Sequence, residues 1–124
     1  MYLKSYKELV VWQKSMELAV SIYKLTSKFP QSEIYVLVSQ MRRAVVAISS
    51  NIAEGYGRKS SKEYHQFLSI AYASGLELET QLTLSKRLGF ARVEDFEKSQ
   101  FLLDEVLKML NSMKTKIKAL NPIP

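Results

Sequence analysis

The chain has 124 residues, the length of one typical domain. Of these residues 47% are hydrophobic, and only 4 are Gly and 3 are Pro, a composition that excludes a disordered tail. We therefore predict one folded domain over residues 1–124. The absence of Cys excludes disulfides, thiolate metal sites and cysteine nucleophiles. A net charge of +6 permits contact with nucleic acid or an acidic protein without requiring it.

Helix-breaking residues divide the sequence into four uninterrupted segments. The breakers stand at Pro30, Gly55, Gly57, Gly89, Pro122 and Pro124. Ser5 with Glu8 and Ser60 with Glu63 fit the capping box, in which side chains satisfy the unpaired amides of the first turn, and Ser32 precedes Glu33. We predict helices over residues 8–28, 33–55, 61–88 and 93–119.

Each segment carries an apolar stripe at spacings of three and four residues, which is typical of nearly antiparallel helix packing. Short connections make consecutive helices neighbours, so we predict an all-α, antiparallel up-down-up-down four-helix bundle. Ala71, Ser74 and Gly75 form a small-residue patch that would let a neighbouring backbone approach closely; alternatively, Gly75 is merely tolerated. The expected core positions are Leu9, Trp12, Met16, Ala19, Tyr23, Ile34, Val38, Met41, Val45, Ile48, Ile52, Tyr64, Leu68, Ala71, Gly75, Leu78, Leu82, Phe96, Leu103, Val106, Leu110, Met113, Ile117 and Leu120.

A second apolar face in segment 8–28 predicts self-association. At about 100° per residue, this face lies opposite Trp12, Met16 and Tyr23. Segments 33–55 and 61–88 also carry apolar or neutral residues outside their core stripes. Contiguous exposed apolar patches usually mark interfaces, so we predict a homo-oligomer, although apolar surface residues that occur singly are normal. The predicted interface residues are Val11, Leu18, Ile22, Leu25, Val36, Ala47, Ile70 and Leu84.

Residues suited to catalysis are scarce. The one histidine, His65, follows Glu63 at a spacing of two, whereas metal-binding bundles place Glu and His three apart on one helical face. No serine stands in a recognisable activating context. Glu54 and Glu77 could meet across two helices, where a buried polar contact that fixes register or subunit docking is the favoured interpretation. We therefore expect no enzymatic activity, no metal and no cofactor.

The segment EGYGRKSSKEY, from Glu54 to Tyr64, has two interpretations. A glycine-rich backbone, two cations and a helix N-terminus together could bind phosphate. The same residues also fit a turn between helices, with a glycine C-cap, cations at the end of one helix and a serine N-cap on the next.

Antiparallel topology sorts the charges by bundle end. One end holds the start of the first helix, the turn between the second and third, and the finish of the fourth. It collects eight cations against Glu8, Glu54 and Glu63, whereas the other end has six cations against five acids. In a ring of parallel subunits these basic ends would offer a footprint for a phosphate backbone, although cations also complement a helix C-terminus. The predicted nucleic-acid-binding residues are Lys4, Lys7, Arg58, Lys59, Lys62, Lys114, Lys116 and Lys118.

Several segments resemble one protein family. They are VWQK at 11–14, ELAVSIYKLT at 17–26, QMRRAVVAI at 40–48, NIAEGYGRKSSKEY at 51–64, ELETQL at 77–82 and KRLGF at 86–90. Together they resemble the four-helix-bundle family of proteins encoded by intervening sequences of bacterial 23S ribosomal RNA. The resemblance implies a homopentameric barrel and kinship with the accessory variability proteins of diversity-generating retroelements, which bind nucleic acid and a reverse transcriptase. It brings no catalytic residues, and Arg58 and Lys59 match its motif as turn residues.

Two functions remain open from the sequence. The favoured one is a non-enzymatic oligomeric module that binds RNA or DNA, ribosomal RNA included, through its basic end. The alternative is a protein-interaction scaffold whose basic end meets an acidic protein partner. The opening MYLKSYKE lacks the apolar region of a signal peptide, and no segment approaches the roughly 20 apolar residues of a membrane span, so we expect a cytoplasmic protein.

Overall fold

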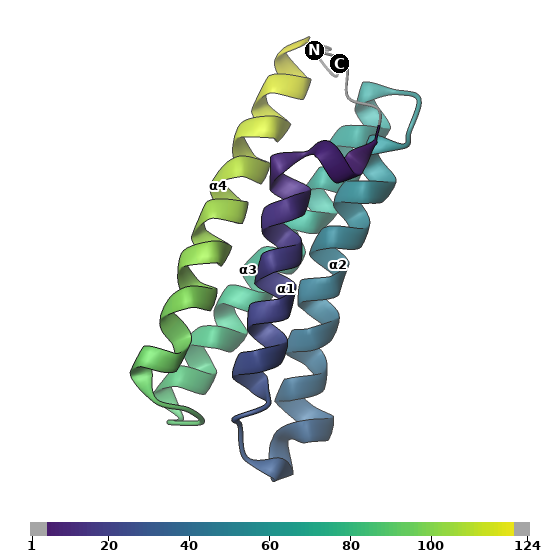
Figure 1. The fold of residues 1–124 in the computed structure, drawn as a ribbon. Helices are drawn as coiled ribbons and strands as arrows, with labels where there is room; N and C mark the ends of the chain where they lie inside the picture. The colour runs from purple at the N-terminus through teal and green to yellow at the C-terminus, as the bar shows by residue number, and fades with distance from the viewer. Residues whose placement is uncertain (1–4, 121–124) are drawn as a thin grey trace.

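The computed structural model describes residues 5–120, which form four long helices and no strand (Figure 1). The helices are α1 (Val10–Thr26), α2 (Ser39–Tyr56), α3 (Ser61–Arg87) and α4 (Glu97–Leu120). The 3-10 turns are η1 (Tyr6–Glu8), η2 (Gln31–Glu33) and η4 (Val93–Phe96), and a π-helical turn, η3 (Ile34–Val38), leads into α2. The predicted all-α fold and antiparallel topology are confirmed.

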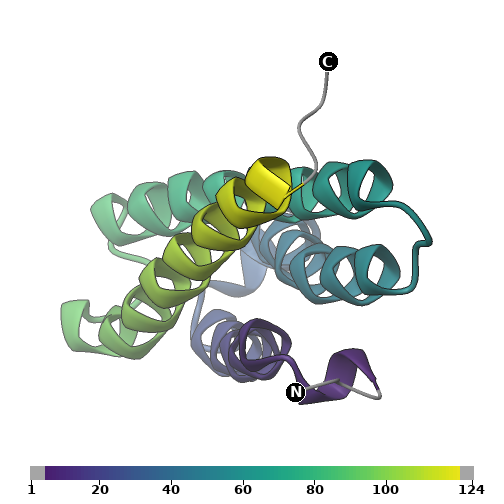
Figure 2. The ribbon, with the colours of Figure 1, turned by 90° about the horizontal axis from the view of Figure 1, so that it is seen from above.

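The four helices enclose one continuous core. α1 and α3 each pack against α2 and α4 and therefore occupy opposite sides of the bundle, as the view from above shows (Figure 2). Two buried serine pairs tie α1 to its neighbours: Ser15 and Ser49 join α1 to α2 with an Oγ–Oγ distance of 2.8 Å, and Ser21 and Ser99 join α1 to α4 at 2.6 Å. Each pair satisfies two buried hydroxyl groups, so the contacts also fix the height of α1 against its neighbours.

The core face of α1 is the one opposite to our prediction. Val11, Leu18, Ile22 and Leu25 are buried inside the bundle, so their prediction as oligomer-interface residues is wrong. Met16, Val20 and Tyr23 instead face outward, with exposed fractions of 40%, 53% and 43%. Both faces of α1 are apolar, and periodicity alone does not say which one turns inward. The inward face also carries Ser15 and Ser21, whose hydroxyl groups meet the serines of α2 and α4.

The helix ends follow their capping chemistry. The Ser60 Oγ accepts the backbone N–H of Glu63 at 3.1 Å, which confirms Ser60 as the N-cap of α3. Ser5 caps η1 rather than a long helix, and α1 begins at Val10. Ile34, a predicted core residue, is 42% exposed because it belongs to the π-helical turn η3, whose wider spacing shifts side chains from the α-helical register. Gly89 ends α3 with a φ of 71°, a conformation that favours glycine.

Two other glycines mark close approaches between helices. A Cβ at Gly75 would lie 2.6 Å from Leu107 Cδ2, so the small-residue patch of α3 accommodates a side chain of α4 and not the neighbouring backbone that we expected. A Cβ at Gly55 would lie 2.8 Å from the Cβ of Phe67, where α2 meets α3. These contacts explain why glycine occupies the interior of two helices despite its low helix propensity.

Candidate nucleic-acid interface

The predicted basic residues gather at one end of the bundle. η1, the turn between α2 and α3 and the last turns of α4 lie together at the top of Figure 1. We call the cations of these three segments the basic end: Lys7, Arg58, Lys59, Lys62, Lys114, Lys116 and Lys118. The eighth predicted residue, Lys4, lies outside the described residues. The seven described cations therefore lie at the same end of the bundle, as the antiparallel topology predicts.

Two cations of the basic end are engaged within the chain. The Arg58 guanidinium lies 3.6 Å from Glu54 Oε2 and 4.5 Å from the centroid of the Phe67 ring. The Lys114 ammonium lies 4.7 Å from the centroid of the Tyr72 ring, which places it against α3. Arg58 and Lys114 thus hold parts of the fold together through ion-pair and cation–π contacts.

The other five cations are available to a ligand. Lys7, Lys59, Lys62, Lys116 and Lys118 are exposed, and none of them forms an ion pair with another residue of the range 5–120. They come from three separate segments, so a ligand that contacts all of them must be extended over the end of the bundle.

The opposite end neutralises more of its charge internally. Lys28 Nζ lies 2.9 Å from Asp95 Oδ1, and Arg92 Nε lies 3.3 Å from Glu94 Oε1. The hydrogen bond from Lys28 lowers the pKa of the Asp95 carboxyl group against the opposing effect of burial. The difference in ion pairing between the two ends adds to the difference in net charge that the sequence predicts.

His65 is a titratable residue of the basic end for which no role is evident from sequence motifs. It lies in the second turn of α3 and is half-buried. Burial lowers its pKa below 6.5, and the charges of Lys114 and Lys118 on α4 lower it further. These effects favour the neutral form of the imidazole. Its place beside two lysines depends on the packing of α3 against α4, which no sequence motif reveals.

Two backbone amides at the start of the α2–α3 turn are satisfied internally. The amide of Gly57 donates to the carbonyl groups of Ala53 and Glu54, and the amide of Arg58 donates to Gly55 at 3.1 Å. Gly57 has a φ of −78°, so it does not act as a left-handed glycine cap. These amides are not free to cradle a phosphate, which favours the turn over the phosphate-loop interpretation of the segment Glu54 to Tyr64.

Glu54 and Glu77 lie far apart in the structure. Glu54 lies in the last turn of α2, whereas Glu77 is 16 residues into α3, roughly 24 Å along that helix at 1.5 Å per residue. The two carboxylates therefore do not meet across α2 and α3 within one subunit. Within residues 5–120, no group of three or more His, Cys, Asp or Glu side chains could hold a metal ion.

The remaining predicted interface residues do lie outside the core. Val36, Ile70 and Leu84 are exposed, and Ala47 is half-buried. Their role in self-association stays a prediction. None of the helices formed by residues 5–120 is long and apolar enough to cross a membrane.

Comparisons with known proteins place the fold in a known family. A model of the family described as 23S rRNA-intervening sequence protein matches residues 7–112. A crystal structure of a protein with unknown function from the S23 ribosomal protein family of Bacteroides thetaiotaomicron is similar at 29% sequence identity and a TM-score of 0.78. The similarity covers 86% of this chain and 96% of that one. No curated protein matches the chain.

Proposed function

Because the chain belongs to the family of 23S rRNA-intervening sequence proteins, we propose that it is a non-enzymatic, self-associating cytoplasmic module that binds RNA through its basic end. The observation that carries this proposal is the set of five exposed lysines without ion-pair partners among residues 5–120, which three distant segments bring to one end. The family's name describes ribosomal RNA insertions, so structured ribosomal RNA is the first ligand to test.

Binding by such a surface depends on salt in a characteristic way. Lysines that neutralise phosphates release the counterions condensed on the nucleic acid, so affinity falls as salt is raised. Five phosphate contacts on one subunit correspond to a slope of log K against log salt of about −3.5 to −4.5. An assembly that brings several basic ends together would have a steeper slope of log K against log salt.

A gel-shift titration against structured ribosomal RNA at several KCl concentrations tests the proposal. We expect binding at low salt that weakens steeply as salt rises. The double variant Lys116→Gln/Lys118→Gln should bind more weakly with a shallower slope. The matched double variant Lys86→Gln/Arg87→Gln, which removes two exposed cations from the opposite end, should bind like the wild type. No binding at low salt, or binding that salt does not change, would overturn the proposal.

Self-association is the second part of the proposal. Met16, Val20 and Tyr23 of α1, with Tyr35 and Val46 near or on α2, leave large apolar side chains exposed on the outer side of the bundle. Apolar patches of this kind usually mark interfaces. The family resemblance favours five subunits, a number that a mass measurement would test.

A protein-interaction scaffold is the second candidate, and one observation favours it. Tyr35 in η3 is 93% exposed beside Val36, far from the basic end, and exposed aromatic side chains are frequent anchors of protein interfaces. The partner would be acidic, and the resemblance to accessory variability proteins suggests a reverse transcriptase. A pull-down with and without nuclease separates the candidates, since a protein retained after nuclease treatment favours the scaffold.

A further inference from the structure

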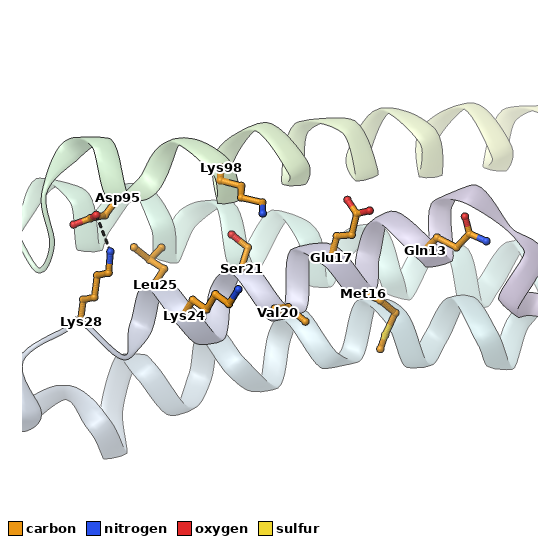
Figure 3. A pocket seen from close by; sticks show the side chains of 10 residues that line it. All are labelled: Gln13, Met16, Glu17, Val20, Ser21, Lys24, Leu25, Lys28, Asp95 and Lys98. Carbon is orange, nitrogen blue, oxygen red and sulfur yellow. Dashed lines mark hydrogen bonds and ion pairs between the residues drawn. The ribbon is translucent and has the colours of Figure 1, made fainter.

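A long groove runs along the seam between α1 and α4 (Figure 3). It has a volume of about 470 Å³, and Met16, Val20 and Leu25 supply apolar side chains to its lining. Lys24 and Lys98 lie on either side of Ser21, and Lys28 reaches Asp95 at one end of the groove. We call this surface the α1–α4 groove.

The α1–α4 groove has an unbalanced charge. Its two acids are both near a cation: Asp95 is paired with Lys28, and Glu17 Oε2 lies 3.9 Å from Lys14 Nζ. Lys24 and Lys98 form no ion pair with any residue in 5–120. A ligand for this groove must therefore combine an apolar group with negative charge near Lys24 and Lys98.

The chain itself carries a surface of that kind on the outside of α4. Phe101 is 65% exposed, and Glu97 and Lys108, one and two turns away on the same side of the helix, are exposed as well. At about 100° per residue these three lie within about 40° of one another. We call them the α4 outer face. Glu97 has no cation partner among the described residues, and Asp104, at the α3 edge of this face, accepts a hydrogen bond from Gln100.

The two surfaces match in order and in height. The Ser21–Ser99 and Lys28–Asp95 contacts put the start of α4 level with the end of α1. In a neighbouring subunit that stands parallel at the same height, Glu97 is level with Lys24 and Lys98. Phe101 is then level with Val20, whereas Lys108 lies beyond Glu17 toward the other end of the bundle. Acid meets base at one end of the groove, and the aromatic ring meets its apolar middle.

We propose that the α1–α4 groove of one copy binds the α4 outer face of a second copy. This proposal rests on the self-association within the proposed function and assigns its surfaces. The groove and the outer face differ from each other, so each subunit uses both, and the contact is head-to-tail. When such a contact joins parallel subunits of equal height, repetition involves no rise, and the contact forms a ring if the rotation between neighbours closes. Every basic end then lies on the same side of that ring.

A mixing experiment with two variants tests the assignment. Val20→Asp puts a charge into the groove, and Phe101→Asp puts one on the outer face. Both positions are exposed, so the folded subunit should survive, which circular dichroism checks. We expect the wild type to sediment as a multiple of 14.2 kDa and each variant as a single subunit. An equimolar mixture should form a 1:1 heterodimer and nothing larger, because one intact groove meets one intact outer face.

Leu76→Asp is the matched control. Leu76 is 43% exposed on α3, outside both surfaces, so this variant should assemble like the wild type. Variants at Val20 and Phe101 that remain assembled, or a mixture without heterodimer, would overturn the assignment. Sedimentation tests the interface, whereas RNA binding by the wild type tests the proposed function. The failure of one proposal can therefore be told from the failure of the other.

Discussion

Gly55 and Gly57 stand two residues apart in one motif, yet they have different structural roles. Gly55 is buried where α2 meets α3, and an added methyl group would press on the Cβ of Phe67, an atom fixed to the backbone of α3. Gly57 is exposed at the end of α2 with an ordinary backbone conformation, and its nearest obstacle to a methyl group lies at 3.6 Å. The motif alone does not show this difference.

Gly55→Ala should therefore destabilise the fold and Gly57→Ala should not. Overpacking costs about 1–3 kcal/mol, and alanine's better helix propensity recovers up to about 1 kcal/mol. Gly57→Ala should be neutral or stabilising by less than about 1 kcal/mol. Urea denaturation of both variants measures the difference. Equal free energies of unfolding would show that the contact with Phe67 is not tight.

The lowered pKa of His65 makes stability depend on pH. Since the folded pKa lies below the unfolded value of about 6.5, the unfolded chain binds the proton more readily. The free energy of unfolding should fall as pH decreases through about 6.5, and the penalty becomes constant below the folded pKa. His65→Gln should remove this component. Denaturation of both proteins at pH 7.5 and 5.5 tests it, and identical pH dependence would contradict the assignment.

At the scale of elements, one side chain of α2, Arg42, makes several contacts with the end of α1. Arg42 Nε donates to Thr26 Oγ1 at 3.0 Å, and its Nη2 donates to the carbonyl of Tyr23 at 3.3 Å. The guanidinium also lies 4.6 Å from the Tyr23 ring centroid. A cation at this position satisfies a carbonyl of the last turn of α1 and complements the negative end of its dipole.

Arg42→Ala should cost about 1–3 kcal/mol, because it removes charge-assisted hydrogen bonds and leaves the buried Thr26 hydroxyl with fewer partners. Arg43→Ala is the control, since Arg43 is exposed and its loss should change stability by less than about 0.5 kcal/mol. Thermal unfolding compares the two. If both variants melt alike, Arg42 does not anchor α1.

The elements themselves are largely predictable from sequence. Glycine, proline and the Ser60 cap separate four helices. The inner stripes of α2, α3 and α4 follow from apolar residues at spacings of three and four, although exposed apolar residues such as Val46, Ile70 and Phe101 lie outside them. The orientation of α1 is not predictable in this way, since Leu18 and Val20 lie on faces of similar hydrophobicity. The π-helical turn at Ile34 also has no signature in periodicity, because it depends on how α2 packs.

The candidate nucleic-acid interface is also predictable from sequence only in part. Topology alone brings the basic residues to one end, so their clustering follows from the predicted helices. Which of them remain free is a matter of side-chain contacts: Arg58 stacks on Phe67 and Lys114 on Tyr72, contacts that only the packed helices define.

For the whole molecule, assembly and RNA binding should be coupled. In the head-to-tail ring the basic ends share one side and their potentials add, whereas a single subunit presents only its own lysines. Phe101→Asp, though far from the basic end, should therefore bind RNA more weakly and with a shallower salt slope than the wild type. Leu76→Asp should retain both the affinity and the salt slope of the wild type. Unchanged binding by Phe101→Asp would separate RNA recognition from assembly.

Lysine footprinting of the RNA complex tests the central claim most directly. The unmodified protein is treated with an amine-acetylating reagent with and without structured RNA, and mass spectrometry measures the reactivity of each lysine. RNA should protect Lys59, Lys62, Lys116 and Lys118, while Lys86 at the opposite end should stay reactive. Protection of Lys86 with no protection of the basic end, or uniform reactivity in a complex that has formed, would contradict RNA binding through the basic end.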